Sequence, residues 1–469
     1  MPALYDKASA DTWQPAQPKD AELKGRWWEI FGEPELNSLE EQLDVNNQNI
    51  KQFFQNFMAA RAQVAEARAA YFPTLSLEPA YSKTHAPSTV PRVSAGSGGV
   101  LSTVAPGQFT QFQLPFDASW SPDLWGRVSN TVLQARYSAQ LSAADLANER
   151  LTEEADLAVF WFELRGQDEL SDLYYHTLAA YRESLELTRT LVETGIDSQE
   201  DLAAAELVLR NAEASAEGIG INRAIFEHAI ATLIGKAPAG FSLPAKSLTT
   251  AVPAIPVTLP SRLLERRPDI AAAERACAAA NAQIGVERAS YFPTLTLDAS
   301  GGFTSSVINE LLKAPARFWS IGASASQAII GGGLRGATMA QFRAQYEADV
   351  AAYRQTVLTA FQQVEDFTAT LRITSVQIER QRAAVAAAAQ YLGIVTTRYQ
   401  LGIDPYLNVM TAQVNLLADQ QNLVLLRVSE MMAAVQLVQA LGGGWDVSQL
   451  PAASEVTHKE AAKELEAPH

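Results

Sequence analysis

The sequence has few of the residues that catalysis or metal binding requires. Its 469 residues include one cysteine, Cys277, which we expect to be a small buried helix residue, and five histidines without ligand spacing. No Ser, His and Asp set is recognisable, and the glycine-rich GGGLRG at 331–336 lacks the Lys-Ser/Thr of a phosphate-binding loop. We therefore expect no enzyme, no metal site and no cofactor.

Positive charge and long apolar runs are also scarce. Lys and Arg total 36 against 52 Asp and Glu, a formal net charge of -16, which excludes a broad basic surface for nucleic acid. No run of about 18 apolar residues is uninterrupted, so we expect no helix to cross a bilayer alone and any membrane passage to use strands. Residues 1–20 lack the basic and apolar regions of a signal peptide, which fits either a cytosolic protein or one whose signal has been removed.

The sequence does contain an internal duplication. The motif RAQVAEARAAYFPTLSL around Tyr71 returns as NAQIGVERASYFPTLTL around Tyr291, and LVETGID at Gly195 returns as RYQLGID at Gly402. The first pair lies 220 residues apart and the second 207, so the first half must carry 13 extra residues. We assign the insertion to residues 83–108, whose Ser, Gly, Pro and Thr content predicts a surface loop.

Each half follows the order helix, β-hairpin, long helix, turn and helix. A helical stretch at 38–70 stops at Pro73, and beyond it the apolar period changes to two. Each long helical pattern runs for roughly 65 residues, or about 100 Å. The expected first structural repeat is 38–235, with a hairpin at 74–122, a long helix at 127–194 and a helix at 199–234. The expected second repeat is 263–442, with a hairpin at 294–329, a long helix at 336–401 and a helix at 405–441.

The two hairpins supply four amphipathic strands, in which residues such as Leu75, Leu77 and Tyr81 alternate with polar ones. A four-stranded sheet has two open edges, and unpaired backbone groups are too costly in lipid. Closure must come from other chains: a dimer would give a narrow tube of 8 strands and a trimer a pore of 12. The alternative is a half-buried sheet in a soluble protein with coiled-coil arms.

Five motifs together resemble the TolC-like outer-membrane efflux factors, specifically the OprM-like (NodT-type) lipoprotein branch of tripartite drug efflux systems. They are WWEIFGEPELNSL from Trp27, LLERRPDIAAAERACAAANAQIGVERASYFPTL from Leu263, AFQQVEDF, RYQLGIDPYLNVMTAQ and ALGGGWD. The resemblance covers roughly residues 25 to 446. It implies a mixed α and β membrane protein: a trimeric 12-strand β-barrel, with four strands per protomer, continuous with a 12-helix periplasmic α-barrel. An equatorial domain would draw on 1–37, 236–262 and 443–469.

The same resemblance implies the function, the partners and the location. The chain would be the outer-membrane channel of a tripartite efflux pump, passively conducting drugs or other small molecules. Its partners would be two further copies in a homotrimer, a periplasmic adaptor (membrane fusion protein), an inner-membrane RND-type pump and outer-membrane lipid. Members of the branch begin at a lipidated cysteine, and this sequence shows none, so the N-terminal lipid anchor is not visible in it.

Two other functions remain open from the sequence. One is a TolC-like exit duct for type I protein secretion, although the RRPDI stretch at 266–270 favours the drug-efflux branch. The other is a soluble coiled-coil scaffold.

A gate is expected at the GID turns, because they lie at the end of the helices opposite the strands. By resemblance, Leu407 occupies the position of the branch's apolar constriction, where a ring of leucines blocks by dewetting. Thr411 stands where the branch usually has an aspartate. The nearby polar substitutes are Asp404, Asn408, Asp197 and Asp201. An alternative interpretation makes Leu407 an ordinary helix-packing residue and the acids first-turn residues favoured by the helix dipole.

Four more residues complete the expected tip. Arg398 and Tyr399 precede the second turn and are candidate tethers between neighbouring helices, which must release on opening. Gly195 and Gly402 are expected helix C-caps. Since the chain carries no nucleotide site, opening must be driven by partners that bind the open tip more tightly.

Overall fold

The structure is a computed structural model, and it describes residues 25–86, 92–95, 101–104, 107–248, 250–253, 255, 265–452 and 455–457. The described residues leave out parts of the expected equatorial domain, which was assigned to 1–37, 236–262 and 443–469. The expected N-terminal anchor also lies outside them. The chain divides into two compact units. The helical unit comprises 1–59, 139–275 and 350–469, and the strand unit comprises 60–138 and 276–349.

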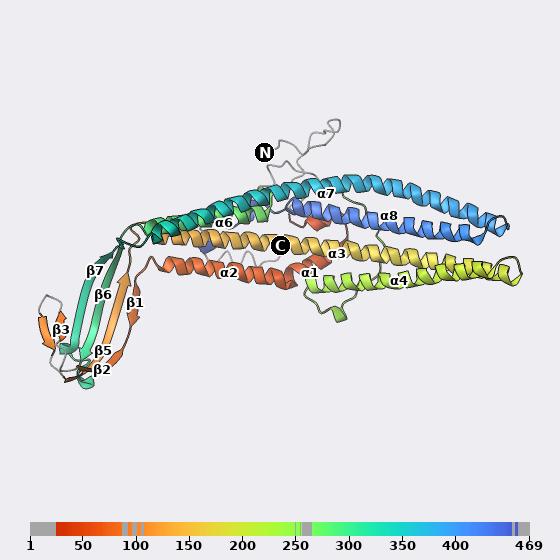
Figure 1. Ribbon diagram of the computed structural model, residues 1–469. Coiled ribbons are helices and arrows are strands. Elements are labelled where there is room, and N and C mark those ends of the chain that lie inside the picture. The colour runs from red at the N-terminus through yellow and green to blue at the C-terminus, as the bar shows by residue number, and fades with distance from the viewer. Residues whose placement is uncertain are drawn as a thin grey trace, which may run out of the picture. The chain divides into compact units, whose positions relative to one another are not determined.

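The strand unit contains an antiparallel sheet, labelled in Figure 1. Its strands are β1 (Thr74–Leu77), β2 (Ala80–Ala86), β5 (Gly107–Trp120), β6 (Thr294–Ser305) and β7 (Arg317–Ser326). β1 and β2 pair with successive parts of β5, as in Thr74 opposite Ser119 and Tyr81 opposite Phe112, and β5, β6 and β7 follow in order. Within the described residues, the sheet thus has four strand positions and two edges without a partner strand.

The predicted surface loop at 83–108 is wrong over part of its length. β2 extends to Ala86, and two short strands, β3 (Arg92–Ala95) and β4 (Leu101–Val104), pair with each other. Antiparallel pairing satisfies backbone groups that a plain loop would leave to water, and it needs no apolar pattern. Composition alone therefore could not predict it.

Large apolar side chains of the sheet are exposed in the single chain. Leu75 is 73% exposed, and Trp319 and Ile321 are each 79% exposed. Such a concentration of exposed apolar surface is typical of a face that contacts lipid or another chain.

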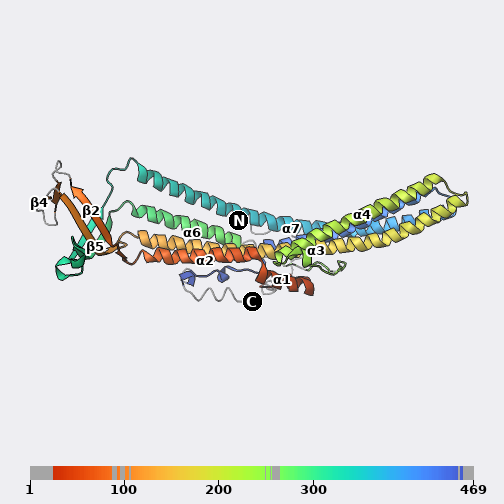
Figure 2. The same ribbon diagram turned by 90° about the horizontal axis from the view of Figure 1, so that it is seen from below.

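Two hairpins of long helices make up most of the helical unit. One is α3 (Arg127–Glu193) with α4 (Gln199–Leu233), and the other is α7 (Leu334–Gln400) with α8 (Tyr406–Ala440). The first residues of α3 and α7 belong to the strand unit. α4 contacts α8, and both views place the α3–α4 turn and the α7–α8 turn at the same end of this unit (Figure 1 and Figure 2). We call this end the tip.

The helix expected at 38–70 is two helices, α1 (Pro34–Asn46) and α2 (Gln48–Ala69). The chain turns at Asn47, whose Oδ1 accepts a hydrogen bond of 3.0 Å from the backbone N–H of Ile50 and so caps α2. The Asn47 amide also donates to Glu153 and to the Leu233 carbonyl, at 2.9 and 3.0 Å. Partners more than 100 residues away stabilise the break, which local propensity does not reveal.

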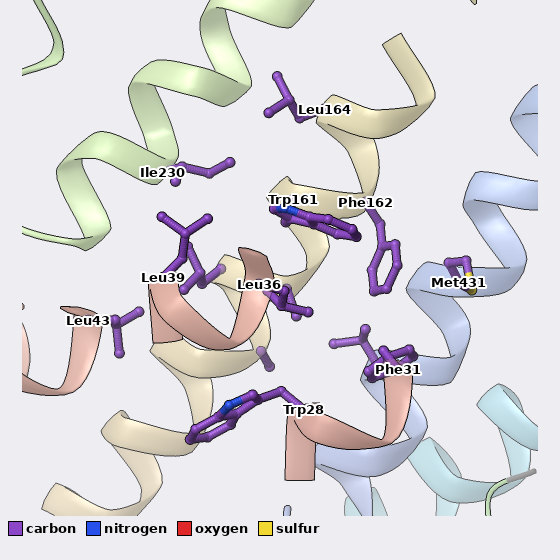
Figure 3. Packing of buried hydrophobic residues seen from close by; sticks show 14 of the residues in the cluster. Trp28, Phe31, Leu36, Leu39, Leu43, Trp161, Phe162, Leu164, Ile230 and Met431 are labelled. Carbon is purple, nitrogen blue, oxygen red and sulfur yellow. The ribbon is translucent and has the colours of Figure 1, made fainter. Parts of the chain in front are cut away.

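A large apolar cluster, which we call the central core, joins α1, α3, α4 and α8 to the 3-10 helix η2 (Trp27–Phe31). Figure 3 shows Trp161 and Phe162 of α3 packed between Leu36 of α1 and Met431 of α8. By length and apolar composition α8 is the one described helix that could cross a membrane, contrary to the expectation, but half of that stretch is buried within the chain. Its apolar residues supply the core.

The central core also buries charged groups. Arg165 is buried and donates to Asp168 at 2.7 Å and to Glu35 at 2.8 Å. Glu40 is fully buried and neither of its carboxyl oxygens has a hydrogen-bond partner among the described residues, whereas Glu154 accepts a 2.8 Å bond from the Trp27 indole. Burial raises the pKa of Glu40 and of Glu154, which favours the neutral form of these two carboxyls.

Candidate functional site

The two tip turns have the same backbone geometry. Gly195 and Gly402 have φ of 76° and 69°, the left-handed region that glycine adopts without strain. The N–H of Ile196 bonds to the Leu191 carbonyl, and the N–H of Ile403 bonds to the Arg398 carbonyl. These are Schellman caps, and they turn α3 and α7 back into α4 and α8.

The start of α4 accounts for one of the candidate acids. Ser198 is the N-cap of α4, and its hydroxyl accepts from the Asp201 N–H at 3.2 Å and donates to the Asp201 carboxylate at 2.6 Å. Asp201 therefore stabilises the first turn of α4 through its bonds with the N-cap, as the alternative interpretation expected.

Arg398 bonds within its own hairpin. Its guanidinium donates to both carboxylate oxygens of Asp404, at 2.6 and 3.0 Å, and this pairing lowers the pKa of Asp404. The pair thus braces the α7–α8 turn and makes no contact with the α3–α4 hairpin among the described contacts.

Tyr399, by contrast, connects the two hairpins. Its hydroxyl donates to the Asp197 carboxylate in the α3–α4 turn, and the same oxygen lies 3.2 Å from the Thr188 hydroxyl on α3. The ring is buried against Tyr406, with ring centroids 5.4 Å apart. Burial, then the bond to Asp197, raises the pKa of Tyr399, so the hydroxyl remains a donor.

Leu407 is not a packing residue within the single chain. Its side chain is 58% exposed, although its neighbour Tyr406 is fully buried. Asn408 is half-buried, and Thr411 is exposed with its hydroxyl donating to the Leu407 carbonyl at 2.8 Å. Leu407 therefore stands one position from a buried tyrosine but leaves an exposed apolar group at the tip.

The candidate residues thus separate into three groups. Tyr399 and Asp197 join the hairpins, Arg398 and Asp404 brace one turn, and Leu407 and Thr411 are exposed in the single chain. Sequence reasoning missed Thr188, Ser184 and Tyr406. A seven-residue spacing was a signal for two of them, because Thr188 follows Tyr181 and Tyr406 follows Tyr399 at that interval. Among the described residues, no group of three or more His, Cys, Asp or Glu side chains is arranged to hold a metal ion.

This combination of a duplicated chain, two long helical hairpins and an antiparallel sheet has relatives. The family model for outer membrane efflux proteins matches residues 39–236 and 259–443. The chain belongs to the outer membrane efflux protein family. The predicted family is therefore confirmed, and with it the channel function, the bacterial outer-membrane location and the absence of enzymatic activity.

Individual members of the outer membrane efflux proteins support this assignment. The probable efflux pump outer membrane protein TtgC of Pseudomonas putida is 32% identical over 447 residues, covering 92% of this chain and 88% of the relative. OprJ of Pseudomonas aeruginosa is 29% identical and covers 95% and 93% of the two chains. The solved structure of the outer-membrane channel OprN is 26% identical, with a TM-score of 0.80 over 92% of this chain and 96% of that one.

Proposed function

We propose that three copies of this chain close their sheets into one 12-strand barrel, continuous with a 12-helix periplasmic tunnel, and conduct small molecules out of the cell. The observation that carries the proposal is the sheet, which has two edges without a partner strand and large exposed apolar side chains. In lipid those edges must pair, and pairing with identical copies closes the cylinder without any further component.

The cargo follows from the relatives. Two proteins from Pseudomonas putida, each 32% identical, are named as parts of an antibiotic efflux pump and of a toluene efflux pump. We infer that this channel passes antibiotic-like or solvent-like molecules delivered by an inner-membrane RND-type pump through a periplasmic adaptor. The exposed turn residues Ile196, Leu401 and Ile403 offer the adaptor an apolar contact at the tip.

The gate of the proposed trimer lies at the tip. Three Leu407 side chains, exposed in the single chain, meet on the pore axis and exclude water from a narrow aperture. The Tyr399 bond to Asp197 holds the α7–α8 hairpin against the α3–α4 hairpin and so keeps the aperture narrow. Adaptor binding opens it by favouring the state in which this bond is broken.

Assembly is tested by measuring the mass of the purified complex in detergent and its conductance in planar bilayers. We expect the mass of three chains and discrete channel events. A complex of one or two chains would contradict the proposed barrel, as would a trimer that does not conduct even when it carries Leu407→Ala.

The gate is tested by Leu407→Ala, with Leu358→Ala as the control because Leu358 is similarly exposed on α7 but lies 44 residues before Gly402 of the turn. Shortening the side chain widens the aperture, so Leu407→Ala should raise single-channel conductance while the control leaves it unchanged. Unchanged conductance in Leu407→Ala would remove this residue from the gate.

A further inference from the structure

Beyond the turns, buried tyrosines continue along the contact between the two hairpins. Tyr174 and Tyr181 of α3 are each about 5% exposed, in an apolar tip core with residues such as Val208 and Val409. The Tyr181 hydroxyl donates to the backbone carbonyl of Gln413 on α8 at 3.0 Å. The Tyr174 hydroxyl accepts a hydrogen bond from the Gln421 amide of the same helix.

These polar contacts recur at a regular spacing. On α3, Tyr174, Tyr181 and Thr188 are seven residues apart, and the Thr188 hydroxyl lies 3.2 Å from the Tyr399 hydroxyl. On α8, Tyr406 and Gln413 are also seven apart; the Tyr406 hydroxyl lies 3.4 Å from the Ser184 hydroxyl. A seven-residue spacing places side chains along one seam between packed helices, and polar groups within an apolar seam fix the register at some cost in stability.

The contacts near the tip differ from those further along α3. Tyr399 bonds to the carboxylate of Asp197 in a turn, where a partner protein can reach it. Tyr181 and Tyr174 bond only to a backbone carbonyl and an amide within the tip core. Burial also raises the pKa of Tyr181 to about 12, so its hydroxyl remains a donor at physiological pH.

We propose that the Tyr181–Gln413 and Tyr174–Gln421 contacts form a register lock, which fixes α8 against α3 and confines gate opening to the part of α8 between the turn and Gln413. The lock rests on the proposed gate at Leu407. Gln413 lies six positions after Leu407, so the segment that moves spans about 9 Å of α8.

The Tyr181 bond resists sliding of α8. Its acceptor is a main-chain oxygen, which moves with the helix axis, so a slide of α8 along α3 without rotation takes this oxygen out of reach. A screw shift of α8 by one residue, about 1.5 Å and 100°, would bring an adjacent carbonyl to the same place, so the packing of buried residues such as Val409 and Ala412 must exclude that shift.

The test removes the two hydroxyls and keeps the rings, in the double variant Tyr174→Phe and Tyr181→Phe of the assembled channel. Two controls are available. Tyr175→Phe changes the neighbouring tyrosine, which is 72% exposed. Gln413→Met removes a side-chain oxygen that is buried without a partner among the described residues, but keeps the carbonyl to which Tyr181 donates.

The readout is amide hydrogen exchange along α8, which reports local opening. In the wild type and both controls, fast exchange should be confined to amides on the tip side of Gln413. In the double variant, amides 413–421 should exchange about tenfold faster, as expected for the loss of hydrogen bonds that hold this segment closed. Amides at 430–438 in the central core serve as the internal reference and should be unchanged.

Two outcomes would overturn the lock. One is exchange at 413–421 within twofold of the wild type in the double variant. The other is an equal acceleration at 430–438, which indicates a general loss of stability. Neither depends on the conductance of Leu407→Ala, so a failed lock is distinguishable from a failed gate.

Discussion

The central core and the tip core lie in the same helical unit but are stabilised by different interactions. The central core packs large side chains such as Trp27, Trp161 and Phe162, each no more than 1% exposed. The tip core is built mainly of Ala, Val and Tyr, and tyrosine hydroxyls link its helices. Apolar burial changes gradually with displacement, whereas a hydrogen bond weakens steeply with distance and angle. Contacts in the tip core therefore depend more sharply on the relative placement of its helices than those in the central core.

The two regions also shift the pKa of their carboxyl groups in opposite directions. Burial, together with the charges of neighbouring acids, raises the pKa of Glu40 well above its usual value in the central core. At the tip, the Arg398 guanidinium lowers the pKa of Asp404. Rising pH should therefore weaken the central core, and only strong acid should affect the Asp404 pair.

The largest expected effect is from Trp161→Ala. This side chain packs edge-on against Phe162, with centroids 5.0 Å apart, and lies 5.2 Å from the Arg165 guanidinium. Its removal should lower the free energy of unfolding by about 3–5 kcal/mol, since it leaves a cavity that rigid neighbours cannot fill. Denaturant unfolding in detergent would measure the loss, with the exposed Tyr175→Ala as the control. A loss no greater than in the control would refute the role of the central core.

The next largest is a dependence on pH. Burial, then the nearby Asp44 charge, raises the pKa of Glu154 to about 8 from 4.5. The folded state therefore holds a proton that the unfolded state releases. The stability from this group is complete below about pH 4.5 and is lost as pH rises to about 8, by up to about 1.4 kcal/mol per pH unit.

Glu154→Gln provides the test, because its amide oxygen can still accept from the Trp27 indole but carries no titrating proton. As pH rises from 5 to 8, the unfolding midpoint of the wild type should decrease, and that of the variant should decrease less. The variant should therefore be the more stable protein at pH 8. Parallel curves for the two proteins would contradict the assignment.

A smaller effect is expected at the break between α1 and α2. Asn47→Ala removes the cap on the Ile50 N–H and leaves the Leu233 carbonyl without this donor. The loss should be about 1–2 kcal/mol in the free energy of unfolding. Gln48→Ala is the adjacent control, because its amide contact with the Asn46 carbonyl is exposed. Equal losses in the two variants would show that the cap contributes nothing.

The smallest effect should come from Asp404→Asn. The Arg398 side chain of this ion pair is 51% exposed, and pairs open to solvent contribute little to stability. We expect no measurable shift in the thermal midpoint at pH 7, in contrast to the central core. A clear fall in the midpoint would place the tip turn among the stabilising elements and weaken the comparison.

Much of the fold follows from local sequence features. The long helices were recognisable because their period persists for more than sixty residues, and the tip turns because only glycine adopts the positive φ seen at Gly195 and Gly402. The repeated YFP at 71–73 and 291–293 marks the end of each helix before a strand. These features depend on residues within one or two turns of each other.

The features that sequence reasoning missed depend on distant partners. Asn47 breaks a helix through contacts with Glu153 and Leu233, and Tyr399 meets Asp197 about 200 residues away. The β3 and β4 segments pair with each other, but they have no apolar alternation in the sequence that would predict a strand. From the sequence, Arg398 and Tyr399 are equivalent candidate tethers. The structure shows that Arg398 bonds to Asp404 in its own hairpin and that Tyr399 bonds to Asp197 in the other hairpin.

The matched lengths of the helices constrain how this protein can change over time. α3 and α7 each contain 67 residues, and α4 and α8 each contain 35. Deleting a single residue from one long helix would rotate everything beyond it by about 100° and part Tyr399 from Thr188. An insertion or deletion in one long helix must therefore be matched by one of the same length in the other. The two halves of the gene can change their helix length only together.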